Sequence, residues 1–336
     1  MASLIKLLPA AMIALGLALT IVTGGFGDAG RDGRSLAIVV IGGLAGGSVL
    51  IAMIGRLLSR EWLDLIEDEL LPAGGMVLLA CVLCLAGELP GDPFSLSPTD
   101  NRALWFTPTA LWSRFALFAA LVAGLCIAMT TSRGYRRKVA ALGLPLLASA
   151  FALVAVDFSM LVAPIWWSAL VPIGWIANQL TGALSLAFCY HLAQRERGEP
   201  EEFASMAAAL LSLAGLDLWI GIVQYLIAWY GNLPEAALYY EARSIASPWA
   251  MEVAAFCQTL AALVLLVTRA RLAMLAAAAL LLVAYGAQAI WRAGGLDPTA
   301  AMAFGGLLVV WLGGLGLVAS RYDRYRKQRK AFESNG

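Results

Sequence analysis

The stretch SLAIVVIGGLAGGSVLIAMIGR, residues 35–56, contains no charged side chain before its last residue. A helix needs about 20 apolar residues to span a hydrocarbon core of ~30 Å, because each residue adds ~1.5 Å. This stretch has that length, and its glycine-rich part GGLAGGS (42–48) suits a helix that packs closely against others in lipid. It therefore predicts a membrane-spanning helix.

Similar runs recur along the whole chain of 336 residues, which is 61% hydrophobic and only 13% charged. A soluble domain carries roughly a quarter charged residues. We therefore predict an all-α, polytopic membrane protein that forms one integral membrane domain (1–336) with about ten transmembrane helices. The first run is expected to be a retained helix and not a cleaved signal peptide. The predicted spans are 4–24, 35–56, 70–88, 110–131, 138–158, 166–193, 205–230, 247–268, 271–292 and 299–320.

The basic residues indicate how these spans are oriented. With both termini in the cytoplasm, 17 of the 23 lysine and arginine residues fall on the cytoplasmic side. The positive-inside rule then predicts a multi-pass protein of a bacterial cell inner membrane with both termini cytoplasmic. The formal net charge of +1 gives no electrostatic reason to expect nucleic acid as a partner.

Metal and haem ligands are scarce in this sequence. His191 is the only histidine, so the chain cannot supply two histidine ligands to a haem, and no C-x-x-C-H motif is present. Cys81 and Cys84 form a C-x-x-C pair within one turn of an apolar helix, with no further ligand nearby. We interpret them as small core residues. We expect no metal site and no cofactor bound covalently or by metal ligation.

Ionisable groups inside hydrocarbon cost several kcal/mol and usually face a cavity, a partner or a proton path. Asp217 lies near the middle of 205–230 and is the strongest candidate for such a role. Gln224 lies two helical turns further on, so it should share a face with Asp217.

Further polar residues extend this pattern by their depth in the membrane. We predict a proton ladder, or the surroundings of a quinone, from Asp157, Asp217, Gln224, Glu252, Asn178, Gln179 and His191. In the alternative interpretation Asn178 and Gln179, like Gln258 and Gln288, only make hydrogen bonds between helices.

Two stretches carry a resemblance to a known family: AVDFSMLVAPIWWSALVPIGWIANQL (155–180) and IVQYLIAWYGNLPEAALYY (222–240). They resemble the NrfD-like membrane subunit (ActF type) of alternative complex III, a quinol:electron-acceptor (cytochrome c) oxidoreductase. The N-L-P-E turn is the more specific part. The matching positions are Asp157, Phe158, Met160, Pro164, Trp166 or Trp167, and Ser168 in the first stretch, and Gln224, Tyr225, Ala228, Trp229, Asn232, Leu233, Pro234 and Glu235 in the second.

The resemblance implies two four-helix bundles, from the second to fifth and the sixth to ninth helices, flanked by one helix at each end. It implies that the signature loops 159–165 and 231–246 lie outside. It also implies a second NrfD-like subunit and periplasmic iron-sulfur and haem c subunits as partners, with quinone or quinol bound at a subunit interface. The chain differs from the family at Phe256–Gln258, where histidine and proline are expected, and at Gln288, where an acid is expected.

The function that follows is that of a membrane subunit that shapes the quinol site, a proton pathway, or both, without a redox cofactor of its own. The alternative is a secondary transporter or permease with intramembrane acidic residues. Transporters usually contain broken helices at matching positions in their two halves, which would distinguish the two functions.

The orientation can be tested with single cysteines introduced by Ser244→Cys and Ser132→Cys into a chain without its native cysteines. We expect a membrane-impermeant thiol reagent added from the periplasm to label the cysteine at position 244 and not the one at position 132. Labelling of position 132 from the periplasm would contradict the predicted orientation.

Overall fold

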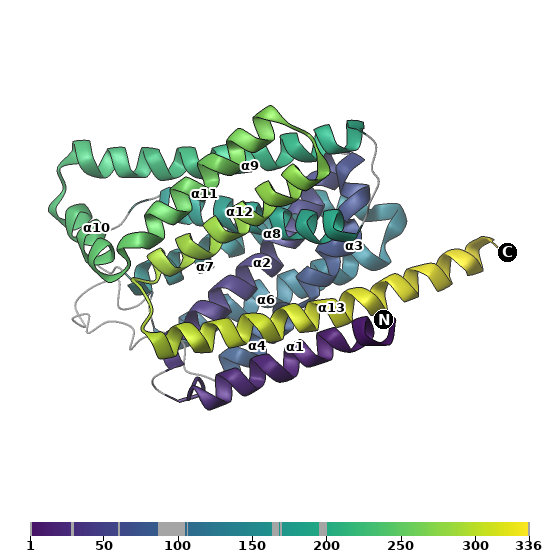
Figure 1. The fold of residues 1–336 in the computed structure, drawn as a ribbon, viewed down its shortest axis with the longest axis horizontal. Coiled ribbons are helices and arrows are strands. Elements are labelled where there is room, and N and C mark those ends of the chain that lie inside the picture. Colours follow the sequence, from purple (N-terminus) through teal and green to yellow (C-terminus); the bar gives the residue numbers. More distant parts are fainter. Residues whose placement is uncertain are drawn as a thin grey trace.

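The computed structural model describes residues 2–27, 30–59, 61–86, 105, 107–162, 168, 170–194 and 200–334. Within these ranges all regular structure is helical, and most of the helices run side by side along one elongated bundle (Figure 1). The α-helices are α1 (Ala2–Val22), α2 (Arg31–Leu58), α3 (Glu61–Gly75), α4 (Val77–Ala86), α6 (Pro108–Thr131), α7 (Arg136–Val162), α8 (Leu170–Gln194), α9 (Pro200–Gly231), α10 (Pro234–Ala246), α11 (Pro248–Val267), α12 (Arg271–Arg292) and α13 (Pro298–Ser334).

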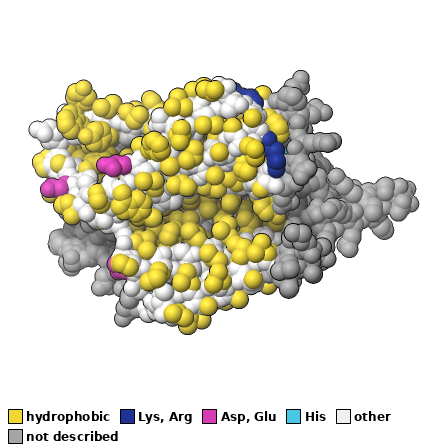
Figure 2. Space-filling model, viewed as in Figure 1, with side chains coloured by type: hydrophobic (Ala, Val, Ile, Leu, Met, Phe, Trp, Pro, Cys, Tyr) yellow, Lys and Arg dark blue, Asp and Glu magenta, His cyan; other side chains and the backbone are white. Residues whose placement is uncertain are grey.

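Among the described residues, eight helices are long and apolar enough to cross a membrane. Two shorter apolar stretches, Leu8–Val22 and Glu69–Val82, lie in α1 and across α3 and α4. The face seen in Figure 2 is almost entirely hydrophobic along the bundle, and its few visible charged side chains lie toward the two ends. The prediction of an all-α, polytopic membrane protein is confirmed.

The long helices form two groups flanked by a pair of terminal helices. α2, α3, α4, α6 and α7 pack against one another, and so do α8, α9, α11 and α12. The groups meet mainly where α2 packs on α8, and the first and last helices, α1 and α13, pack on each other. We call the groups the first bundle and the second bundle. This arrangement agrees with the two flanked four-helix bundles that the resemblance implies.

Glycine permits the closest of these contacts. A Cβ atom added at Gly47 in the GGLAGGS stretch would lie 2.7 Å from the carbonyl oxygen of Gln179 on α8. One added at Gly16 of α1 would lie 2.5 Å from the carbonyl oxygen of Gly306 on α13. Both backbones therefore approach to distances that any larger residue would prevent, as is common between helices in lipid.

The third predicted span, 70–88, differs from the structure. Its helix begins earlier, at Glu61, and is interrupted at Met76 between α3 and α4; residues 87 and 88 lie outside the described ranges. Pro72 has no N–H to donate within α3, and the following Gly74 and Gly75 favour helix weakly. The N–H of Met76 instead donates to the carbonyl of Ala73 at 3.1 Å in a tight turn.

The prediction that 231–246 forms a loop is wrong, because α10 occupies most of it. Pro234 stands in its first turn, where its missing N–H costs nothing, and Glu235 and Arg243 complement the helix dipole at the two ends. A helix of 13 residues is too short to span a membrane, so a search for long apolar runs does not find it. The basic C-terminal segment is likewise helical and continues α13 to Ser334.

The bundle thus has two distinguishable ends. α10 lies at one end, which we call the α10 end, together with the end of α9 and the start of α11 (Figure 1). Both termini lie at the other end, which we call the terminal end (Figure 1).

Gly305 and Gly306 provide a matched test of the contact between α1 and α13. A Cβ atom at Gly306 would collide with Thr20 Oγ1, whereas one at Gly305 would meet nothing within 4 Å. We expect Gly306→Leu to destabilise the protein in detergent by about 1–3 kcal/mol, the usual cost of overpacking. Gly305→Leu should leave the thermal unfolding transition nearly unchanged. Equal effects of the two substitutions would contradict the close contact.

Candidate functional site

Asp217 lies on α9 inside the second bundle and is buried. Its Oδ2 atom accepts hydrogen bonds from three side-chain amides, each on a different helix. The donors are Asn178 Nδ2 of α8 at 3.2 Å, Gln258 Nε2 of α11 at 2.6 Å and Gln288 Nε2 of α12 at 3.2 Å. All four helices of the second bundle therefore converge on one carboxylate.

Arg292, the last residue of α12, joins this cluster from the α10 end. Its guanidinium donates to Asn178 Oδ1 at 3.3 Å and to Gln288 Oε1 at 2.9 Å, so it orients two of the amides that hold Asp217. It also supplies the positive charge that a buried carboxylate needs. We call Asp217, Asn178, Gln258, Gln288 and Arg292 the Asp217 cluster.

A cavity of about 260 Å³ lies between the Asp217 cluster and α10. Its polar lining includes Asp217 and Gln224, and its aromatic lining comes from α9, α10 and α12. Tyr240 contacts Tyr225 edge to face at 5.4 Å between ring centroids and packs on Trp291 at 5.7 Å. The cavity thus has a charged, hydrogen-bonding floor and aromatic walls.

Arg243 fixes α10 over this cavity. Its guanidinium stacks on the Tyr239 ring at 3.6 Å and donates to the main-chain carbonyl of Arg292 at 3.3 Å, which ties α10 to the end of α12. Burial raises the pKa of Tyr239 and Tyr240, so both phenols stay neutral near pH 7. Burial also lowers the pKa of Arg243, an effect that the two tyrosines oppose.

The cluster leaves one carboxylate oxygen for a ligand. Among the described residues, hydrogen bonds reach Asp217 only at Oδ2. Asp217 is part of the cavity lining. A ligand in the cavity that carries a hydroxyl group would find a charged acceptor whose position is fixed by four helices.

The structure joins some residues of the predicted proton ladder and separates others. Asp217, Gln224 and Asn178 lie together, since the first two line the cavity and Asn178 donates to Asp217. Gln179 belongs to a different contact, because its Oε1 accepts from Tyr285 Oη at 2.5 Å. Glu252 is exposed on α11.

Two further members of the ladder lie in clusters of their own. His191 is buried, with its Nδ1 at 3.5 Å from Glu69 Oε1 on α3. Asp157 of α7 lies in the first bundle, bound to Arg114 of α6. Neither residue has a hydrogen bond to the Asp217 cluster among the described contacts, so the continuous ladder stays a prediction.

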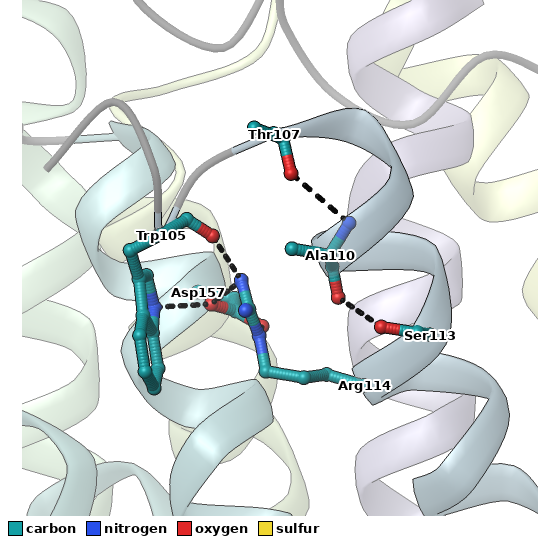
Figure 3. Close-up of polar contacts among 6 residues, drawn as sticks. All are labelled: Trp105, Thr107, Ala110, Ser113, Arg114 and Asp157. Carbon is teal, nitrogen blue, oxygen red and sulfur yellow. Dashed lines mark hydrogen bonds and ion pairs between the residues drawn. The ribbon is translucent and has the colours of Figure 1, made fainter.

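Asp157 has the contacts of a structural ion pair. Arg114 donates through Nε to Oδ2 at 2.6 Å and through Nη2 to Oδ1 at 2.8 Å, and Trp105 Nε1 also donates to Oδ1 at 3.2 Å (Figure 3). Arg114 also donates to the carbonyl of Trp105 and lies over its ring (Figure 3). Both carboxylate oxygens of Asp157 thus accept hydrogen bonds, which leaves the side chain poorly suited to proton transfer.

The signature residues have local structural roles. Ser168 accepts through Oγ from the N–H of Leu170 where α8 begins. Asn232 ends α9 with a φ of 45°, a left-handed conformation that asparagine tolerates, and Pro234 and Glu235 begin α10. Trp229 is exposed, and Trp167 lies outside the described residues.

Four residues of the site were not predicted from the sequence: Arg292, Tyr239, Tyr240 and Trp291. The spacing of four between Arg292 and Gln288 places both on one helix face, and that signal could have joined Arg292 to the polar residues. The tyrosines lie on α10, which was interpreted as a loop.

The ion pair of Asp157 predicts a non-additive mutant series. We expect Arg114→Gln to destabilise the protein by about 3 kcal/mol, because it leaves a buried carboxylate without its counter-charge. Asp157→Asn added to Arg114→Gln should recover part of the loss, measured by thermal unfolding in detergent. Arg137→Gln, at an exposed arginine of α7, is the control. Additive effects of the two substitutions would contradict the pairing.

No cluster of three histidine, cysteine, aspartate or glutamate residues suited to a metal occurs among the described residues. A scan against protein-family models found no match to this chain, and neither did a search of curated proteins.

Proposed function

We propose that this chain is the quinol-side membrane subunit of a quinol:electron-acceptor oxidoreductase of the alternative complex III type, and that the cavity above Asp217 binds the quinol headgroup. The main support for the proposal is the Asp217 carboxylate that lines the cavity, of which one oxygen is hydrogen-bonded by described residues and the other is not. Asp217 Oδ2 is held by three amides, and no described residue bonds Oδ1. A quinol hydroxyl is a donor suited to that oxygen.

The cavity lining supports a flat, aromatic ligand. Tyr225, Tyr240 and Trp291 offer ring faces and edges within one cluster, and aromatic pairs favour such stacked or edge-to-face contacts. The remaining lining is mostly apolar, as in most sites that bind small organic molecules.

The position of the cavity opening on the side of the bundle favours a lipid-soluble ligand. Ile222 and Tyr225 of α9 and Met251 of α11 line it and are also exposed on the lateral, apolar surface. A molecule dissolved in the bilayer can therefore enter between α9 and α11 without crossing water. A water-soluble transport substrate would need an opening at an end of the bundle.

In the proposed reaction this chain binds the quinol and removes a proton from its hydroxyl group. Oxidation of a quinol releases protons and electrons. Asp217 Oδ1 accepts a hydroxyl proton, and the amides with Arg292 keep the carboxylate in place before and after the transfer. The electrons pass to redox groups of partner subunits, for which we propose periplasmic iron-sulfur and haem c proteins beside a second NrfD-like subunit.

The orientation follows from the same proposal. The α10 end would face the periplasm of a bacterial inner membrane and the terminal end the cytoplasm, in line with the positive-inside rule. Asp217 would then release its proton outward, through the cavity side that Gln224 lines.

A transporter is less well supported by the helix geometry. The second helix of the first bundle is broken at Met76, between α3 and α4. The second helix of the second bundle, α9, is continuous from Pro200 to Gly231. Among the described helices the break is thus unpaired, unlike the paired breaks common in transporters.

Purification in mild detergent followed by quinol oxidation tests the proposal. We expect redox subunits to copurify and the complex to oxidise quinol. Asp217→Asn keeps the shape of the side chain but cannot take a proton, and it should lower turnover about a hundredfold, the lower range for loss of a general base.

Two tryptophan substitutions separate the cavity from general damage. Ala255→Trp fills the cavity and should abolish turnover without loss of assembly. Ala120→Trp places the same ring on the exposed surface of α6 and should leave turnover unchanged. Full turnover with Asp217→Asn and Ala255→Trp, or purification of the chain without redox subunits, would refute the proposed function.

A further inference from the structure

A second buried titratable pair lies near the terminal end, apart from the Asp217 cluster. Glu69 of α3 and His191 of α8 face each other with 3.5 Å between Oε1 and Nδ1, a distance too long for a good direct hydrogen bond. His191 Nδ1 and Glu69 Oε2 are both buried, and neither has a hydrogen-bond partner among the described residues.

Buried polar atoms without partners are rare and need an explanation, for which a bound water is common. A small cavity of about 20 Å³ touches Glu69, large enough for one water molecule. Its lining is mostly apolar and includes Ser48 of α2 and Tyr190, the residue before His191, but not His191 itself. The cavity therefore touches the pair at Glu69.

The surrounding charges are paired with one another or turned to main-chain groups. Glu67, two residues before Glu69, binds Arg56 of α2 at 2.7 Å and Arg136 of α7 at 2.9 Å. Arg271 of α12 donates to the carbonyl of Leu192 at 2.8 Å, just after His191. The side chains of α13 at the cavity, Leu315 and Ala319, are apolar.

We propose that Glu69 and His191 form a water-bridged proton-exchange pair that equilibrates with the solution at the terminal end. A proton on Glu69 passes through the bridging water to Nδ1, which converts a carboxylic acid and a neutral imidazole into a carboxylate and an imidazolium. The reverse transfer restores both neutral groups, so no other reactant is needed. This site is separate from the proposed quinol cavity and does not depend on it.

The sole histidine of the chain makes a direct test possible. The full chain, purified without a histidine tag and labelled with ring-¹⁵N histidine, gives one imidazole in solid-state NMR of lipid vesicles. We expect a proton on Nδ1 in the wild type, seen as one-bond coupling to that nitrogen. In Glu69→Gln this coupling should be lost, because the amide can donate to Nδ1. Glu235→Gln, at an exposed carboxylate of α10, should leave the spectrum unchanged.

The side of access is measured on the wild type, which avoids any folding defect. In vesicles whose protease-sensitive C-terminus faces outward, an external pH step should change the His191 signal, and an internal step should not. Ala319→Leu keeps both groups but narrows the cavity, and it should slow exchange of the Nδ1 proton with water at least tenfold.

Identical spectra of the wild type and Glu69→Gln, or a response to pH only from the α10 end, would overturn the proposal. These measurements need neither quinol nor partner subunits. A negative result here would therefore not bear on the proposed quinol function. Refutation of the quinol function would likewise not bear on the proposed Glu69–His191 pair.

Discussion

A carboxylate inside a hydrocarbon slab must be compensated by the protein itself, and the second bundle is arranged around that requirement. Oδ2 of Asp217 takes one amide from each of α8, α11 and α12, and Arg292 adds the opposing charge. In lipid there is no water to replace a missing partner, so a shift of any helix along its neighbours would leave a charge uncompensated. The cluster therefore fixes the relative positions of four helices and at the same time exposes one carboxylate oxygen.

Buried polar groups elsewhere in the described part of the chain form separate clusters. Asp157 and Arg114 saturate each other in the first bundle, while Glu67 is held by two arginines near the terminal end. Within the second bundle, Tyr285 Oη of α12 donates to Gln179 Oε1 of α8. Between the bundles, the glycines of α2 allow its backbone to approach that of α8. Saturated pairs hold the helices together. Among the described residues, Asp217 and the Glu69–His191 pair each keep a titratable atom without a hydrogen-bond partner, and these are the groups for which we propose a reaction.

Helix positions could be predicted from the sequence because an apolar run of fixed length is a physical requirement of the membrane. The depth of Asp217 within a predicted span also identified it as a candidate. α10 could not be predicted in this way, because its 13 residues are too few to span a membrane. Its role also depends on the hydrogen bond from Arg243 to α12.

The contacts between polar residues could not be predicted from the sequence. The depth of a residue in the membrane does not say which neighbouring helix its side chain faces, so Asp157 and Asp217 were predicted to belong to one proton path. Gln258 and Gln288 are the donors that hold Asp217, together with Asn178. Their role depends on contacts between three helices, which no single stretch encodes.

The glycine contact between the first and last helices has a consequence for biogenesis. α1 leaves the ribosome before the helices of both bundles, and its main partner α13 leaves after them, so Gly16 has no facing backbone until both bundles have been translated. The closing of this pair must be a late step of assembly, after both bundles are inserted. Chains cut short before Gly306 would keep both bundles but leave α1 unpaired in the lipid, where quality-control proteases of the membrane could distinguish them from finished molecules.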